Sequence, residues 1–190
     1  DTLAGRIAAG KVLDAAFGST APKLLEQTEA VHIVACGTSY HAGLIARYWI
    51  EEYCGIACSV EIASEYRYRK GVVPDNSLFV SISQSGETAD TLAAVRAAKK
   101  KTYLTTLAIC NVPESSLVRE SDLVLMTRAG QEIGVASTKA FTAQLAALGL
   151  LTVALARYQG MEAAEERRLT ELLTDLPTMI EQVLTLDGEI

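Results

Sequence analysis

Short apolar segments alternate with helical patterns over most of the chain. The first apolar segment, residues 31–36, has a β-rich composition and ends before Gly37, and a helical pattern follows it through Tyr53. Four similar segments are residues 58–62, 77–82, 103–110 and 122–126, and helical stretches follow them. Strands that alternate with helices predict an α/β three-layer sandwich, in which a five-stranded parallel sheet carries helices on both faces.

A long apolar segment follows the fifth predicted strand. Residues 140–156 carry no charge between Lys139 and Arg157, a length that approaches a membrane span. Polar and small residues interrupt the segment, and no second span or aromatic belt accompanies it. We therefore expect no membrane partner but a buried helix from Ser137 to Tyr158, packed on the sheet or on a partner subunit, and a homodimer.

The two ends of the chain are predicted to be helical connectors. Residues 1–30 carry apolar positions such as Leu3 and Ile7 that suggest helical segments, and residues 162–186 show an amphipathic pattern that is expected to break near Pro177. The length of 190 residues suits one full core. We therefore expect a helical lead-in (1–30), one α/β domain (31–158) and a helical connector (159–190). Because no initiator methionine or signal peptide precedes Asp1, the sequence is expected to start at a domain boundary.

Composition and charge exclude several classes of protein. With 49% hydrophobic and 21% charged residues, the chain is globular rather than disordered. A formal net charge of −6 provides no global positive field for nucleic acid, so any phosphate must be bound locally. Four cysteines without a CxxC pair, and only two histidines, predict no metal site and free thiols in a reducing, cytoplasmic location.

The loop after the third predicted strand is the main candidate for ligand binding, because ligands of such sheets bind at the carboxyl ends of strands. Its sequence, Ser83-Gln-Ser-Gly-Glu-Thr88, opens directly into a helix. A helix N-terminus offers unpaired N–H groups and roughly half a positive charge, which bind phosphate without Lys or Arg. Gly86 permits close approach of the backbone. Ser85 is expected to be the N-cap of this helix, and the alternative to phosphate binding is that Ser85 only caps the helix. Glu87 must point away from a bound phosphate or be compensated.

Two other loops show similar chemistry. The loop after the first strand places Thr38 and Ser39 at a helix start, where they are able to bind sugar hydroxyls, although capping explains Ser39 equally well. Residues 130–139 also lie between a strand and a helix. There, Ser137 is a candidate cap of the long helix, while the backbone of this segment faces the same cleft.

Candidate catalytic groups are few. Cys36 lacks a clear base partner and fits a small buried filler, and His41 at a helix start is a weak candidate base. His32 lies within a strand and is expected to be a satisfied core histidine, and Glu132 has no second acid at a readable spacing. The sequence contains no GxGxxG, GxxxxGK[ST], HExxH or GxSxG motif, so no cofactor is expected.

Five strings in order along the chain carry a family resemblance. They are ACGTSY (35–40), EIASEYRYRK (61–70), SQSGETADTL (83–92), AICNVPESSLVRESD (108–122) and EIGVASTKAFTAQL (132–145). Together they resemble the first sugar isomerase (SIS) domain of the isomerizing glutamine–fructose-6-phosphate aminotransferases, the glucosamine-6-phosphate synthase family. The similarity runs from about Leu3 to the end of the long helix, and it implies an SIS, flavodoxin-like fold.

The resemblance also implies ligands and site residues. The family binds fructose 6-phosphate and glucosamine 6-phosphate, with the phosphate on Ser83, Gln84, Ser85 and Thr88. The sugar would then contact Thr38, Ser39, and the backbone and side chains around Val135 and Ser137. In the full-length family protein, a glutaminase domain and a second SIS domain with a tail supply the catalytic groups. Because both are missing from this sequence, no catalytic residue is carried over, and the fragment is expected to bind sugar phosphates without turning them over.

Three alternatives stay open. An SIS-type sugar-phosphate sensor would carry an appended basic helix-turn-helix, and the sequence shows none. Another phosphosugar isomerase or deglycase would bind the same ligand, although the string VASTKAFTAQL argues for the synthase. A pure dimerisation scaffold would leave the hydroxyl-rich loops unexplained.

Overall fold

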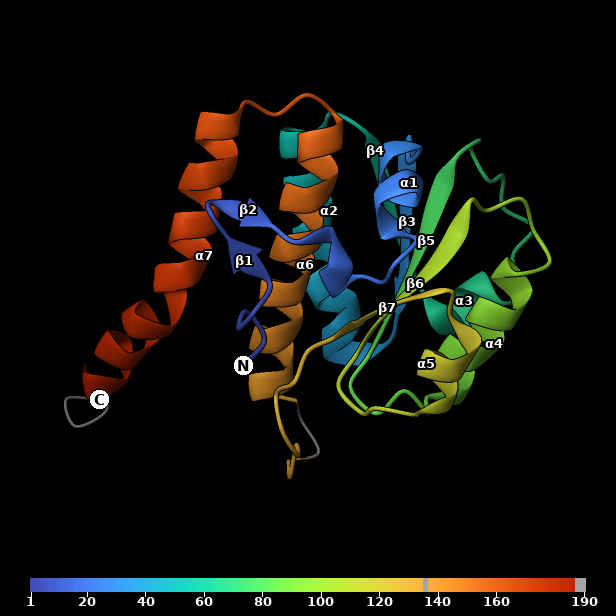
Figure 1. The fold of residues 1–190 in the computed structure, drawn as a ribbon. Helices are drawn as coiled ribbons and strands as arrows, with labels where there is room; N and C mark the ends of the chain where they lie inside the picture. The colour runs from blue at the N-terminus through green and yellow to red at the C-terminus, as the bar shows by residue number, and fades with distance from the viewer. Residues whose placement is uncertain (135–136, 187–190) are drawn as a thin grey trace.

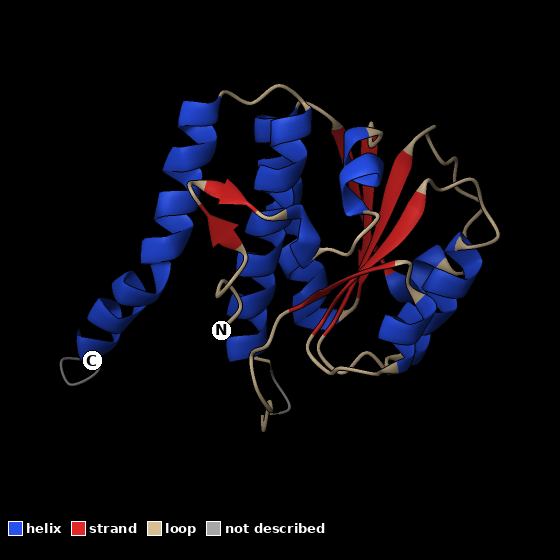
Figure 2. Cartoon of the chain, viewed as in Figure 1, coloured by secondary structure: helices blue, strands red, loops and turns tan. Residues whose placement is uncertain are grey.

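The chain is built around one five-stranded parallel sheet (Figures 1 and 2). The computed structural model describes residues 1–134 and 137–186. The strands lie in the order β4-β3-β5-β6-β7, and every neighbouring pair is parallel. Their bounds are β3 (Ala30–Ala35), β4 (Ala57–Ile62), β5 (Ser77–Ser83), β6 (Thr105–Cys110) and β7 (Leu123–Met126). The predicted sheet is confirmed, with strand ends that differ from the sequence pattern by a residue or two.

Helices cover both faces of this sheet (Figure 2). One face packs against α1 (Ala21–Glu26), α2 (Gly37–Cys54) and α6 (Lys139–Tyr158), and the other packs against α3 (Ala63–Tyr66), α4 (Ala89–Ala98) and α5 (Ser116–Glu120). Because side chains alternate along a strand, Ile33 joins the first core and Val34 joins the second. The three-layer α/β sandwich is therefore confirmed.

The long apolar helix α6 lies in the interior. It is the one helix among the described residues that is long and apolar enough to cross a membrane, and 67% of its most apolar window is buried inside the molecule. Leu148, Leu151 and Leu155 are fully buried against the sheet. The hydrophobicity of α6 is thus explained by core packing, as the sequence predicted.

The amino-terminal segment differs from the predicted helical lead-in. Residues 7–12 form an antiparallel hairpin of β1 (Ile7–Ala8) and β2 (Lys11–Val12), and a 3₁₀ turn (Asp14–Ala16) and α1 follow it. Ala9 and Gly10, the two turn residues, both have positive φ angles, of 51° and 71°. That conformation defines the turn of a tight hairpin and cannot occur inside a right-handed helix. The helical expectation at Ile7 is therefore wrong.

The carboxy-terminal helix also differs from the prediction. Helix α7 (Ala163–Leu184) continues through Pro177, where the sequence pattern was expected to break. Proline removes one helical hydrogen bond, but Pro177 is exposed, so its ring projects from the solvent side of the helix. Leu173 and Leu169, one and two turns earlier, pack against the main core and stabilise the helix. Figure 1 shows α7 outside α6, as an additional outer layer.

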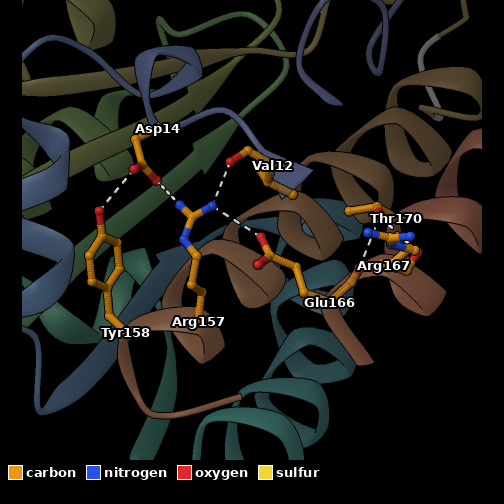
Figure 3. A network of polar contacts seen from close by, with 7 residues as sticks. All are labelled: Val12, Asp14, Arg157, Tyr158, Glu166, Arg167 and Thr170. Carbon is orange, nitrogen blue, oxygen red and sulfur yellow. Dashed lines mark hydrogen bonds and ion pairs between the residues drawn. The ribbon is translucent and has the colours of Figure 1, made fainter. Parts of the chain in front are cut away.

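A buried polar network fastens the hairpin and α7 to α6 (Figure 3). The guanidinium of Arg157 donates to the backbone oxygen of Val12 at 2.9 Å, to Glu166 Oε1 at 3.0 Å and to the carboxylate of Asp14. The hydroxyl of Tyr158 donates to the other oxygen of Asp14 at 2.8 Å. One arginine at the end of α6 therefore joins the start of α7 to the segment after the hairpin, which lies far away in the sequence.

Candidate functional site

The strand order creates a crevice between β3 and β5. The chain passes from β3 to β4 on one side and then returns to place β5 on the other side of β3. Ala35 pairs with Ile82 in register, so the loops that begin at Cys36 and Ser83 leave the sheet side by side. Such a switch point at the carboxyl ends of parallel strands is where ligands of these folds bind.

A polar cleft of about 200 Å³ lies at this crevice. It is lined by Cys36, Ser39, Ile82, Ser83, Gln84, Ser85, Thr88, Thr91 and Ser137. Six of these nine residues carry hydroxyl groups, and Lys and Arg are absent among the described residues that line it. The structure thus brings together six of the eight predicted site residues, from three separate loops.

The loop 83–88, here called the hydroxyl loop, is folded by its own side chains. The N–H of Gly86 donates to Ser83 Oγ at 3.0 Å, and the N–H of Glu87 donates to Ser85 Oγ at 3.2 Å. The hydroxyls of Ser83 and Thr88 are 3.4 Å apart. Because the oxygens of Ser83 and Ser85 accept from the backbone, their protons are left to donate to an acceptor.

Ser85 is not the N-cap of α4, which corrects the prediction. Helix α4 begins at Ala89, and Thr88 occupies the N-cap position with an extended ψ of 116°. The physical reason is Gly86, whose φ of +68° interrupts any right-handed helix. Within the described residues the N-cap Thr88 makes no side-chain cap hydrogen bond, so the first N–H groups of α4 are left without that partner.

The hydroxyl loop packs against the segment that follows β6 and is hydrogen-bonded to it. A Cβ atom on Gly86 would lie 2.1 Å from Ser115 Oγ and 2.8 Å from Cys110 Sγ, so only glycine fits. The oxygen of Gly86 accepts from the N–H of Leu117 at 3.0 Å, and that of Gln84 accepts from the N–H of Asn111 at 3.3 Å. These contacts fix the backbone of the loop against the neighbouring strand.

Two carboxylates near the cleft are engaged by other partners. Glu87 Oε1 accepts from the N–H of Ser116 at 2.7 Å, and this hydrogen bond lowers the pKa of Glu87. Asp90, in the first turn of α4, accepts from Arg67 at 2.9 Å. Glu87, which was expected to point away or to be compensated, accepts from Ser116 instead, and neither carboxylate lines the cleft.

The loop after β3 contributes Ser39 but not Thr38. Helix α2 already begins at Gly37, with Cys36 as its N-cap residue, so Ser39 lies inside the first turn and does not cap the helix. Its hydroxyl oxygen accepts instead from Gln144 Nε2 of α6 at 3.0 Å, in a buried contact. Thr38 is exposed and does not line the cleft, because a helical residue one position earlier projects in another direction.

The third loop reaches the cleft through Ser137. Val135 lies outside the described residues. Helix α6 begins at Lys139 with Thr138 in the N-cap position, so Ser137 is not its cap. The first turn of α6 is bound by Glu132, whose carboxylate accepts from the N–H of Ala140 at 3.1 Å. Glu132 is therefore a structural acceptor.

Thr91 is a lining residue that sequence reasoning missed. Its side chain is buried, and its hydroxyl has no hydrogen-bond partner among the described residues. Thr91 lies three positions after Thr88, so the two residues share one face of the helix start. The spacing of three residues between Thr88 and Thr91 is a sequence signal for this lining position, but it extends beyond the loop 83–88.

The two histidines lie outside the cleft. His32 Nδ1 is 2.6 Å from the hydroxyl of Tyr103, and Nε2 is 3.2 Å from Glu61 Oε1. Burial is the main cause that lowers the pKa of His32, and Glu61 opposes it. His32 is therefore a buried histidine of the core, as predicted, but only its Nδ1 is hydrogen-bonded, since Nε2 lies near Glu61 without making a hydrogen bond among the described residues. His41 is exposed. Among the described residues no group of three His, Cys, Asp or Glu side chains is arranged to hold a metal ion.

Larger hollows occur elsewhere and have a different character. A groove of about 400 Å³ between α2, α6 and α7 is lined almost wholly by apolar side chains, including Trp49, Leu145 and Leu173. Another, of about 510 Å³, separates the hairpin from α7. Neither has convergent polar groups at strand ends, so the smaller polar cleft is the better candidate for a small polar ligand.

Comparisons with known proteins agree with this geometry. The family model of the SIS domain matches residues 24–154. The chain is 57% identical, over 189 residues, to glutamine–fructose-6-phosphate aminotransferase (isomerizing) of Shewanella oneidensis, and 60% identical, over 190 residues, to that of Pseudomonas syringae pv. tomato. All of the chain is covered in both comparisons, but it spans only 31% of the length of each relative.

Solved structures show the same similarity. The C-terminal domain of glucosamine-fructose-6-phosphate aminotransferase from Francisella tularensis superimposes with a TM-score of 0.95 and 52% identity, over 99% of this chain and 53% of that one. Glucosamine-6-phosphate deaminase from Thermotoga maritima superimposes with a TM-score of 0.69 and 26% identity, over 89% of this chain and 53% of that one.

Proposed function

The chain belongs to the SIS domain family, and on this premise we propose that it is the sugar-phosphate-binding first SIS domain of an isomerizing glutamine–fructose-6-phosphate aminotransferase. The observation that carries the proposal is the hydroxyl-lined cleft at the β3–β5 switch point. The ligands would be fructose 6-phosphate and glucosamine 6-phosphate. The proposed domain limits are 31–158, with connectors on either side.

In this proposal the hydroxyl loop binds the phosphate. Ser83, Ser85 and Thr88 donate their hydroxyl protons to phosphate oxygens, Gln84 adds its amide, and the start of α4 supplies N–H groups and positive dipole charge. Ser39 and Ser137 contact the remainder of the ligand, together with Val135 and with Thr38, which turns toward the ligand when the sugar binds. No arginine or lysine is needed, because backbone and hydroxyl donors are sufficient to bind a phosphate.

We further propose that this domain binds without catalysing. Moving a proton between two carbons requires a general base close to the substrate, with a pKa near the working pH. The described residues lining the cleft include no carboxylate, histidine or lysine. The catalytic groups, and the glutaminase that would supply ammonia, would come from other domains of a longer, cytoplasmic protein.

Calorimetry with fructose 6-phosphate and with unphosphorylated fructose tests the phosphate site. We expect the chain to bind only the phosphorylated sugar, and Ser85→Ala to weaken binding roughly ten- to a hundredfold, because one hydrogen bond to a charged group contributes roughly 1.5–3 kcal/mol. Ser59→Ala, at an exposed serine of β4 away from the cleft, is the matched control and should bind normally.

Two outcomes would count against the proposal. Equal affinities for the phosphorylated and the unphosphorylated sugar would remove the phosphate site. Formation of glucosamine 6-phosphate from ammonia and fructose 6-phosphate by this chain alone would contradict binding without turnover.

We also propose a homodimer. Its support is the apolar groove between α2, α6 and α7, together with exposed apolar side chains on α7 such as Leu172 and Val183, which are 49% and 66% exposed. Patches of this kind mark association surfaces. Sedimentation equilibrium should show a dimer that Leu172→Asp dissociates, and a monomeric wild-type chain would disprove it.

A further inference from the structure

Behind the cleft, Ser39 is joined to a buried glutamine that does not line the cleft itself. Gln144 Nε2 of α6 donates to Ser39 Oγ of α2 at 3.0 Å. The two residues are 1% and 7% exposed, so water does not compete for this hydrogen bond. The amide oxygen of Gln144 is buried and has no hydrogen-bond partner among the described residues.

The direction of this hydrogen bond follows from what the amide leaves unpaired. With Nε2 toward Ser39, the groups left without a partner are the carbonyl oxygen and one N–H. With the amide reversed, the buried group without a partner would be an NH₂ with two donors. Unpaired buried N–H groups are rarer in proteins than under-satisfied C=O groups, so the observed orientation is the favoured one. Gln144 is therefore a donor, and Ser39 is its acceptor.

This direction determines what Ser39 is able to do in the cleft. A hydroxyl has one proton and two lone pairs. Because one lone pair of Ser39 accepts from Gln144, its proton is free to point into the cleft that Ser39 lines. A chain of hydrogen bonds in a buried site also polarises each member, which makes the hydroxyl a stronger donor.

We propose that Gln144 is a positioning residue that fixes Ser39 as a hydrogen-bond donor, so that the cleft selects an acceptor oxygen of the sugar part of the ligand at this point. The inference rests on the proposed function and names a residue that does not touch the ligand. It assigns α6 a role in recognition beyond packing in the core.

Two variants of similar size separate the direction of the hydrogen bond from packing. Gln144→Met removes the donor, but leaves the Ser39 hydroxyl able to rotate toward the ligand. Gln144→Glu replaces the donor by a carboxylate acceptor. The Ser39 hydroxyl then donates its hydrogen bond to this carboxylate and no longer to the ligand. We expect Gln144→Met to weaken binding of fructose 6-phosphate only a few-fold. Gln144→Glu should weaken it at least tenfold, which is about 1.4 kcal/mol.

Two further measurements exclude a purely structural effect. Combined with Ser39→Ala, the Gln144→Glu change should cost much less affinity than alone, because the proton it captures is absent. Relative to wild type at the same pH, affinity of the Gln144→Glu variant should recover on acidification, since a protonated carboxyl again donates to Ser39. Additive effects, or a loss that does not change with pH, would overturn the inference.

A measurement without ligand covers the case in which Gln144→Glu does not fold. In NMR spectra, one side-chain amide proton of Gln144 should move upfield in Ser39→Ala, because its acceptor is lost. An unchanged resonance would overturn the inference. A wild-type chain without affinity for fructose 6-phosphate would overturn the proposed function as well, whereas normal wild-type binding with equal effects of the Glu and Met changes would overturn this inference alone.

Discussion

Gly86 combines two constraints at a single residue. Its φ of +68° lies in the left-handed region, and the space where a side chain would begin is filled by Ser115 and Cys110. The first constraint concerns the backbone alone, and the second concerns the fit between the hydroxyl loop and the segment after β6. Another glycine, Gly55, has a φ of +66° with nothing within 4 Å of its absent Cβ. A comparison of Gly55 with Gly86 therefore separates the cost of backbone strain from the cost of a steric collision of the side chain.

We predict that Gly86→Ala destabilises the fold more than Gly55→Ala. The Gly55 change should cost roughly 1–2 kcal/mol, the cost of a left-handed non-glycine residue, and leave ligand affinity unchanged. The Gly86 change adds a steric collision that displaces the hydroxyl loop, so it should also weaken binding of fructose 6-phosphate at least tenfold. Urea unfolding and calorimetry measure the two effects. Equal losses of stability would show that the contact with Ser115 relaxes freely.

His32 gives a pH dependence of stability. Its pKa is lowered, mainly by burial, and its ring faces Glu61, Tyr103, Arg69 and Lys101. Because the unfolded chain then binds more protons than the folded chain, stability is complete above the ordinary histidine pKa. It falls as the pH drops toward the lowered value, by at most about 1.4 kcal/mol per pH unit for one proton.

We therefore predict that His32→Gln flattens the stability profile between pH 7.5 and 5.5. Urea unfolding at both values should show a larger loss for wild type than for His32→Gln. His41→Gln, at an exposed position, is the control and should behave as wild type does. Parallel profiles for wild type and His32→Gln would contradict the assignment.

Among the elements, the contact of α6 with the hairpin and α7 depends on one arginine. Arg157 binds Glu166, whose side chain is 3% exposed, as well as Asp14 and Val12. We predict that Arg157→Met destabilises the fold by roughly 3–5 kcal/mol, because it leaves the carboxylate of Glu166 buried without its partner. Urea unfolding monitored by circular dichroism measures this loss.

The matched control is an exposed ion pair on α7. Arg168 and Glu165 are 2.6 Å apart, with side chains 53% and 36% exposed. Arg168→Ala should cost less than about 1 kcal/mol, because solvent screens such pairs. If the two arginine variants lost similar stability, the buried network in Figure 3 would not be the connection that we describe.

The elements with strong periodic patterns were predictable, and those set by single residues were not. The five strands follow from short apolar segments with clear ends, and α6 follows from one long apolar run. The hairpin at Ala9 and Gly10 was missed because its strands are only two residues long, too short for any period. The break expected at Pro177 does not occur because its ring faces solvent. The sequence alone does not reveal on which side of the helix this ring lies.

For the molecule as a whole, the position of the site was predictable but its internal hydrogen bonds were not. Strand order brings the loops at Ser39 and Ser83 together. The alternation of strands and helices in the sequence predicts a parallel sheet in which such loops lie at the same edge. Which hydroxyl caps a helix depends on where the helix begins, and this shifted by a few residues at Ser85 and Ser39. The contact of Ser39 with Gln144 joins residues 105 positions apart, a separation at which a single sequence carries no pairing signal.

The hydroxyl loop has a consequence for how the molecule discriminates between ligands. Ser83 and Ser85 hold the loop's own N–H groups, and the segment after β6 supports its carbonyl oxygens, so the loop reaches its shape before anything binds. Binding of a ligand would therefore cost the loop little conformational entropy. Under the proposed function, a hexose without its phosphate would leave the donors of this preformed loop unmatched, so the shape of the loop itself would disfavour the wrong sugar.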